Sequence, residues 1–168
     1  MDLPIETQWP LYDRILQFDR RFETRADDGI VVGVLYQGRF RPSTLARDEL
    51  MQFASRTSLQ LGGRDVRLVA IEVTTLREVE LELVERGVDV VYFTPLRGAP
   101  LRELAGLSVE HRMVTLTGVR EYMDSGVGIG LGLRGGRPEI LVNLSSCQAQ
   151  GVELSSELLK LVTFVTTK

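Results

Sequence analysis

The sequence predicts an α/β protein: a three-layer sandwich with a mostly parallel mixed sheet of about six strands between helices. Three observations support this fold class. The chain has 168 residues, the size of one ordinary domain, so residues 1–168 are expected to form a single unit. Short β-branched runs alternate with helical patterns over its first two thirds. The last third holds two strands joined by a turn too short for a crossover, which predicts a C-terminal antiparallel hairpin before a final helix.

The first third of the chain predicts two helices around one strand. Trp9-Pro10 would precede the first helix, whose four apolar residues recur at helical spacing: Leu11, Ile15, Phe18 and Phe22. Ile30–Tyr36 is an aliphatic run, typical of a strand covered on both faces. The second helix would start at Pro42-Ser43-Thr44 and end at Gly62-Gly63.

The middle of the chain predicts three more strands with helices between them. Residues 66–73, 88–93 and 113–116 have the apolar character of strands. Thr75 and Glu78 form a capping-box pattern that opens a helix between the first two strands, and Gly87 would end that helix. A short helix is expected over residues 99–104.

Glycine and aliphatic residues alternate from residue 126 to residue 133. In a strand, this pattern places four glycines on one face: Gly126, Gly128, Gly130 and Gly132. Something must cross that bare face closely, and a helix of the same chain is favoured over a ligand or a second subunit. Residues 130–135 match G-x-G-x-x-G, but a turn and a strand follow, whereas a dinucleotide site needs a helix N-terminus there.

Composition and charge argue against several classes of function. The net charge is −3 and arginines alternate with acids, so no basic stripe for nucleic acid is predicted. No run approaches the ~18 apolar residues of a membrane span. Cys147 is the only cysteine, which excludes an internal disulfide and a multi-cysteine zinc site, and we expect it to be buried. No cofactor and no metal are predicted.

Residues suited to catalysis are few, and we do not expect an enzyme. His111 is the only histidine, and a solvated loop position is favoured for it. Glu72 and Asp89 are a candidate carboxylate pair, although salt bridges to arginine explain them equally well. The remaining candidates are ligand-binding residues, because ligands bind beyond the carboxyl ends of the strands in open parallel sheets. Those ends hold four polar residues: Gln37, Thr74, Thr94 and Thr117. For Thr74, helix capping is the favoured interpretation.

The motifs of the last third resemble the YfiR-like family of small bacterial regulators. In that family a glycine-rich strand is followed by a strand that ends in Asn-Leu, here Asn143-Leu144. A Gly-(aliphatic)-x-(aliphatic)-Ser-Ser step follows over residues 151–156, and then a Leu-Leu helix containing Leu158 and Leu159. IVVGVLY near the N-terminus and VTLTG in the middle extend the resemblance over most of the chain.

The resemblance implies a non-catalytic regulator that represses or senses for a membrane-bound signalling protein, either a diguanylate cyclase or a sensor kinase. A small-molecule-binding domain of periplasmic-binding-protein type is the alternative. The resemblance also implies a homodimer, for which the first helix offers Tyr12, Leu16 and Phe18. The best-known members carry several cysteines, so redox control through disulfides is not expected here. We expect a periplasmic location if a signal peptide was removed ahead of Met1-Asp2-Leu3-Pro4, which itself has no signal character, and a cytoplasmic one otherwise.

Overall fold

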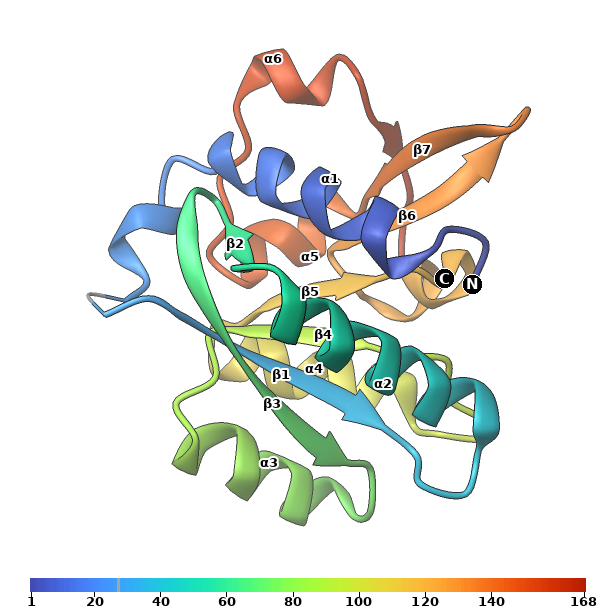
Figure 1. The fold of residues 1–168 in the computed structure, drawn as a ribbon. Helices are drawn as coiled ribbons and strands as arrows, with labels where there is room; N and C mark the ends of the chain where they lie inside the picture. Colours follow the sequence, from blue (N-terminus) through green and yellow to red (C-terminus); the bar gives the residue numbers. More distant parts are fainter. Residues whose placement is uncertain (27) are drawn as a thin grey trace.

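The protein is described by a computed structural model that covers residues 1–26 and 28–168. One mixed sheet runs through it in the order β2-β3-β1-β4-β5-β6-β7-β8 (Figure 1). The strands are β1 (Ile30–Tyr36), β2 (Gln60–Leu61), β3 (Arg64–Glu72), β4 (Val90–Phe93), β5 (Val114–Thr117), β6 (Ile129–Arg134), β7 (Arg137–Val142) and β8 (Thr163–Phe164). The four strands β3, β1, β4 and β5 are mutually parallel and β6 continues them, whereas β6 and β7 form an antiparallel hairpin.

Helices cover both faces of this sheet, as the α/β prediction requires (Figure 1). The helices are α1 (Ile5–Gln17), α2 (Arg41–Arg56), α3 (Leu76–Glu85), α4 (Leu101–Glu110), α5 (Leu144–Ala149) and α6 (Ser156–Leu159), with two 3₁₀ helices, η1 (Phe22–Thr24) and η2 (Arg120–Ser125). One apolar cluster joins the sheet to α1, α2, α5 and α6. A second cluster joins the opposite face to α3, α4 and η2. The α/β class and the mostly parallel sheet are therefore confirmed.

The sheet has eight strands instead of about six. The two additional strands, β2 and β8, contain two residues each and form the two edges of the sheet. Gly62-Gly63 was predicted to end the second helix, but α2 already ends at Arg56, and the two glycines form the turn between β2 and β3 instead. The expected final helix stops at Leu159, and β8 follows it and pairs with β7. The β-branched residues after Lys160 favour a strand over a longer helix.

The first helix begins earlier than predicted and contains Trp9 and Pro10. Its buried stripe starts at Ile5 and includes Trp9, Tyr12 and Leu16. This spacing of three and four residues places all of them on one face against the sheet. Phe18, by contrast, lies just beyond the helix and keeps 38% of its surface exposed.

The alternating glycines do not share a single face. Gly126 ends η2 with φ 101°, and Gly128 lies at a bend before β6, where an added Cβ would meet Gln150 and Cys147. Only Gly130 and Gly132 belong to β6. An added Cβ at Gly130 would lie 2.6 Å from Met123 Sδ of η2. The close approach by a helix of the same chain is therefore confirmed, with a 3₁₀ helix in that role, and Gly135 lies in the strand–turn–strand context that was expected.

Candidate functional site

All four predicted ligand-binding residues lie at the carboxyl ends of the parallel strands. Gln37 follows β1, Thr74 follows β3, Thr94 follows β4, and Thr117 ends β5. Because β3, β1, β4 and β5 are neighbours in the sheet, the four residues lie along one edge. The prediction of their placement is confirmed. Their side chains, however, are engaged in different ways.

Thr94 and Thr117 are completely buried, and their hydroxyl groups are used inside the fold. The Thr94 hydroxyl donates to the Leu35 carbonyl (2.7 Å) and lies 2.7 Å from the Ser43 hydroxyl of α2. The Thr117 hydroxyl donates to the Phe93 carbonyl and accepts from the Val119 amide, both at 3.1 Å. These bonds fix the chain where it leaves the sheet and satisfy buried polar groups.

Thr74 is exposed and belongs to the start of α3. Its hydroxyl bonds to Glu78, and this bond, together with bonds from Thr75, lowers the pKa of the Glu78 carboxyl. The N-cap of α3 is Thr75, whose hydroxyl accepts from the Glu78 amide at 3.2 Å. The predicted capping box of Thr75 and Glu78 is confirmed, whereas the capping interpretation favoured for Thr74 is wrong, because the N-cap is Thr75.

Gln37 is the predicted residue that reaches a cavity. The cavity has a volume of about 320 Å³ and is lined by loop residues: Gln37, Gly38, Arg39, Phe40, Glu72, Val73 and Arg97. The Gln37 side chain accepts from the Arg97 amide (2.6 Å) and donates to the Arg97 carbonyl (3.0 Å). These two bonds tie the loop after β1 to the loop after β4. Ligand binding at this edge stays a prediction, and Gln37 is the residue best placed for it.

Glu72 and Asp89 lie at opposite ends of the sheet and form no carboxylate pair. Glu72 ends β3 and accepts from the Gly38 amide at 3.2 Å. Asp89 precedes β4 and accepts from the Val31 amide at 2.9 Å. Burial raises the pKa of Asp89, although the bond from Val31 and the nearby Arg25 and Arg64 act in the opposite direction.

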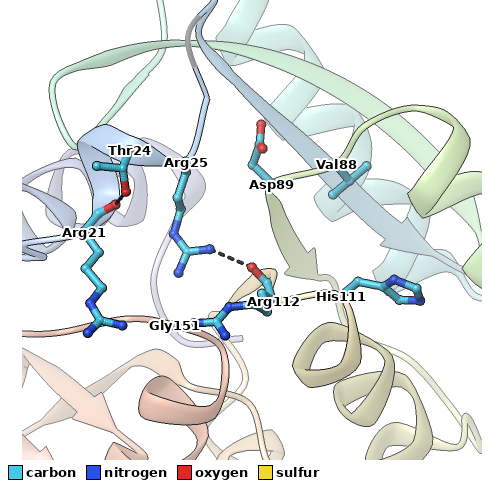
Figure 2. A pocket seen from close by; sticks show the side chains of 8 residues that line it. All are labelled: Arg21, Thr24, Arg25, Val88, Asp89, His111, Arg112 and Gly151. Atoms are coloured by element: carbon cyan, nitrogen blue, oxygen red, sulfur yellow. Dashed lines mark hydrogen bonds between the residues drawn. The ribbon is translucent and has the colours of Figure 1, made fainter.

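A second cavity, which the sequence did not predict, lies beside Asp89 at the amino ends of the strands. Its volume is about 310 Å³, and it is lined by Arg21, Thr24, Arg25, Val88, Asp89, His111, Arg112 and Gly151. Figure 2 shows the three arginine side chains of this lining, two from one segment and one from another. Arg21 and Arg25 flank η1, whereas Arg112 lies in the turn between α4 and β5. Because these segments are far apart in sequence, no motif could indicate that the arginines meet.

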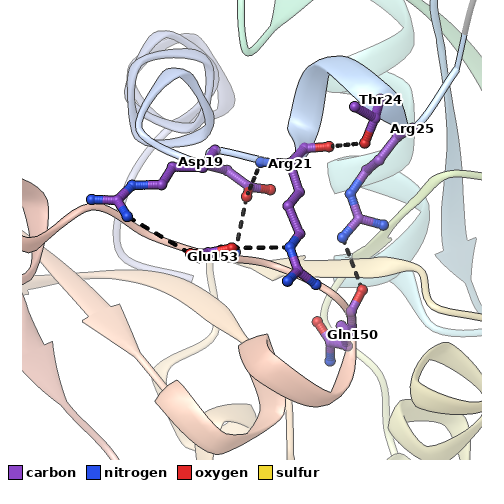
Figure 3. Close-up of polar contacts among 7 residues, drawn as sticks. Asp19, Arg21, Thr24, Arg25, Gln150 and Glu153 are labelled. Atoms are coloured by element: carbon purple, nitrogen blue, oxygen red, sulfur yellow. Dashed lines mark hydrogen bonds and ion pairs between the residues drawn. The ribbon is translucent and has the colours of Figure 1, made fainter.

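Arg25 is held by backbone carbonyls. It donates to the Arg112 carbonyl (2.7 Å) and to the Gln150 carbonyl (2.8 Å), as Figures 2 and 3 show. Its Nε is buried and has no hydrogen-bond partner within the described residues. Burial lowers the pKa of Arg25; Asp19 and Asp89 oppose this effect, and Arg112 adds to it.

Arg112 has φ 54° and is the single non-glycine residue with positive φ in residues 1–26 and 28–168. This left-handed conformation is costly for a side chain with a Cβ. Gly151 lies against it: an added Cβ there would be 3.1 Å from one Arg112 nitrogen and 3.5 Å from one Arg25 nitrogen. The guanidinium groups of Arg25 and Arg112 are therefore close neighbours.

The η1 side of this cavity is tied to the segment after α5 (Figure 3). The Asp19 carboxylate accepts from the amides of Arg21 (3.0 Å) and Glu153 (2.9 Å). The Glu153 carboxylate in turn accepts from Arg21 Nε at 2.9 Å. These contacts hold residues 19–25 and 150–153 together.

His111 and Cys147 have structural surroundings. His111 caps the C-terminal end of α4, and its Nε2 lies 2.7 Å from Glu80 Oε1, so the predicted solvated loop histidine has a carboxylate partner. Glu80, Glu110 and His111 offer ligand atoms within 4.8 Å of one another at the surface. Cys147 is buried as predicted, and its thiol donates to the Gly128 carbonyl. Burial raises the pKa of this thiol to about 12, which disfavours the reactive thiolate.

Within the described residues, every helix is too short or too polar to cross a bilayer. A search of curated proteins found no significant match. Solved structures do share the fold.

One of them is a ligand-free, open substrate-binding protein with adhesive properties from Clostridium difficile. The match covers 88% of this chain and 58% of that protein, with 18% identity and a TM-score of 0.67. The match to a conserved domain protein from Vibrio cholerae covers 99% of this chain and 61% of that protein, with 15% identity and a TM-score of 0.68. The match to an ABC domain in complex with L-Trp from Streptococcus pneumoniae covers 90% of this chain and 60% of that domain, with 12% identity and a TM-score of 0.60. This chain thus spans about three fifths of the length of each structure.

The sequence match is more specific than these likenesses. The family model described as YfiR/HmsC-like matches residues 23–163, which include strands β1 to β7 and the first residue of β8. This agrees with the resemblance carried by Asn143-Leu144 and the Gly-to-Ser-Ser step. The chain therefore belongs to the YfiR/HmsC-like family.

Proposed function

We propose that this protein is a regulatory binding protein that represses or senses for a membrane-bound signalling enzyme, such as a diguanylate cyclase, without catalytic turnover of its own. Membership of the YfiR/HmsC-like family carries the proposal. The surroundings of the reactive side chains support it. His111 is bonded to Glu80, and Cys147 is buried with a raised thiol pKa. A sensor kinase is the other partner of the same class, and contact with either would occur in the periplasm if a signal peptide directs the chain there.

Deletion and complementation in the native host test this proposal. Deleting the gene should raise cyclic-di-GMP and biofilm matrix, and the wild-type gene should restore both to their original levels. His111→Ala and Cys147→Ser should repress as well as the wild type. If either variant folds normally and fails to repress, the non-catalytic assignment is wrong. A pull-down of the tagged protein from its native membrane fraction would identify the partner.

A small-molecule-binding domain of periplasmic-binding-protein type is the second candidate, supported by the fold shared with a substrate-binding protein and by the cavity beside Gln37. The neighbouring genes discriminate between the two candidates. A cyclase or sensor-kinase gene beside this one supports the regulator, whereas a transporter operon supports the small-molecule binder.

We retain the homodimer as a proposal on the family resemblance alone. The surface first suggested for it is wrong, because Tyr12 and Leu16 are fully buried in the core. Light scattering at tens of micromolar should give twice the chain mass of 18.8 kDa. A measured mass equal to that of one chain would contradict the dimer.

A further inference from the structure

The cavity at the amino ends of the strands has an unbalanced charge. Among the described residues, its lining holds three arginines and the Asp89 carboxylate, while Asp19 acts on Arg25 and Glu153 pairs with Arg21. The Asp89 carboxylate already accepts from the Val31 amide, and His111, the remaining titratable group of the lining, is bonded to Glu80. Of these three arginines, Arg112 is therefore the one whose charge no described carboxylate offsets.

The three guanidinium groups differ in how fully they are engaged. Arg21 uses its Nε on Glu153, which leaves its terminal nitrogens without a partner among the described residues. Arg25 donates to two neutral carbonyls, which do not cancel its charge. Arg112 takes part in no ion pair within the part of the chain that the structure describes. Asp19 and Asp89 partly offset the charge of Arg25, whereas Arg112 has no such partner among the described residues, so an anion between the two guanidinium groups would pair with Arg112 and bond to both.

The backbone is shaped around this pair. Arg112 keeps its costly positive φ, and the bond from Arg25 to the Arg112 carbonyl holds that turn. Gly151, with φ 80°, lets the Arg112 guanidinium approach the chain more closely than a side chain at that position would allow. Burial also disfavours the charged form of Arg25, so a nearby anion would offset that cost.

We propose that the cavity lined by Arg21, Arg25 and Arg112 binds a small oxyanion, namely a phosphate or carboxylate group of a free small molecule. A guanidinium presents its donors as a planar fork that matches both groups, and it does not match a halide. The volume of about 310 Å³ lies at the lower limit for small-molecule sites, which fits a compact anion. This site lies at the opposite end of the sheet from Gln37, and it does not depend on the regulatory partner proposed above.

The test is an NMR titration of the full chain with inorganic phosphate, and separately with acetate, at constant ionic strength. Saturable shifts are expected at the amides of Arg112 and Gly151. Arg112→Gln should weaken binding about tenfold or more, because it removes a charge-assisted hydrogen bond. Arg112→Gly should weaken binding equally while the protein stays as stable as the wild type, since glycine tolerates the positive φ. This second variant separates binding from folding.

Arg102→Gln is the matched control, because Arg102 is an exposed arginine at the far end of α4. It should leave binding unchanged. A response to only one of the two anions identifies the group that is recognised. The proposal is overturned if neither anion shifts the cavity amides, or if Arg102→Gln weakens binding as much as Arg112→Gln does.

Discussion

At the scale of single residues, Gly62 has both a positive φ and a crowded Cβ position, whereas its neighbour Gly63 has only the positive φ. Gly62 has φ 57°, and an added Cβ would lie 2.7 Å from Phe22 Cε1. Gly63 has φ 76°, but nothing lies within 4 Å of its Cβ position. Gly62→Ala should lower the free energy of unfolding by about 2–4 kcal/mol, from backbone strain and overpacking together. Gly63→Ala should cost about 1 kcal/mol, from strain alone. Urea denaturation of both variants checks this, and equal losses would contradict it.

Glu139 should make stability depend on acid pH. Burial alone would raise the pKa of this carboxyl, but bonds from Thr163 and Arg120 and the charges of Arg120 and Arg134 lower it overall. A carboxyl whose pKa is lower in the folded protein stabilises it above the unfolded pKa of about 4.3, and this contribution is lost as pH falls through the folded value.

Glu139→Gln should therefore lower the unfolding free energy at pH 7 and flatten its decline below about pH 4.3. Urea melts at several pH values measure both effects. Glu153→Gln is the control, because its ion pairs are exposed and should contribute little. A Glu139→Gln profile parallel to that of the wild type would refute the assignment.

The polar residues at the strand ends show what the sequence could predict at this scale. The strand–loop pattern placed Gln37, Thr94 and Thr117 at one edge of the sheet, and the structure agrees. The sequence pattern could not show that Thr94 and Thr117 are buried, because their burial depends on Ser43 and Phe93, which the fold brings to them. The arginine cavity was missed for a related reason: Arg25 and Arg112 meet only through the parallel sheet.

At the scale of elements, a buried carboxylate helps to hold the segment around η1 to the chain after α5, beside the backbone bond from Arg20 to Glu153 and the Arg21–Glu153 ion pair. Asp19 is 4% exposed and accepts from the amides of Arg21 and Glu153. Asp19→Ala leaves both amides without an acceptor and should cost about 1–3 kcal/mol. Hydrogen exchange at the Glu153 amide should speed up in this variant, because the two segments separate locally. Asp19→Asn keeps one acceptor oxygen and should retain most of the protection; if it exchanges as fast as Asp19→Ala, the carboxylate oxygen is not what holds the segments.

Elements with strong periodic patterns were predictable, and short ones at the edges were not. The α3 helix has a capping box and buries Val79 and Leu83 on one stripe, so it appears within a few residues of its expected bounds. The two-residue strands β2 and β8 have no periodicity of their own and exist because β3 and β7 offer them free edges. Trp9-Pro10 was placed before the first helix, whose predicted apolar spacing began at Leu11, but the packing of Trp9 against the sheet holds the helix through Pro10.

At the scale of the whole molecule, residues 1–168 are predicted to unfold as one domain. Two apolar clusters lie on opposite faces of the sheet, and β1, β4 and β5 contribute side chains to one or both of them. Loss of either cluster exposes the sheet to water on that face. Since parallel strands are stable only when both faces are covered, neither half should persist alone.

Trp9 allows this cooperativity to be measured across the sheet. It is the only tryptophan and is buried in the cluster beside α1. Leu83 of α3 lies in the other cluster and is 1% exposed. Leu83→Ala should lower stability by about 2–5 kcal/mol. The urea midpoint of Trp9 fluorescence should fall together with that of far-UV circular dichroism, because both report the same transition. If the fluorescence midpoint stays at its wild-type value while the dichroism midpoint falls, the two faces unfold separately and the single-domain prediction is wrong.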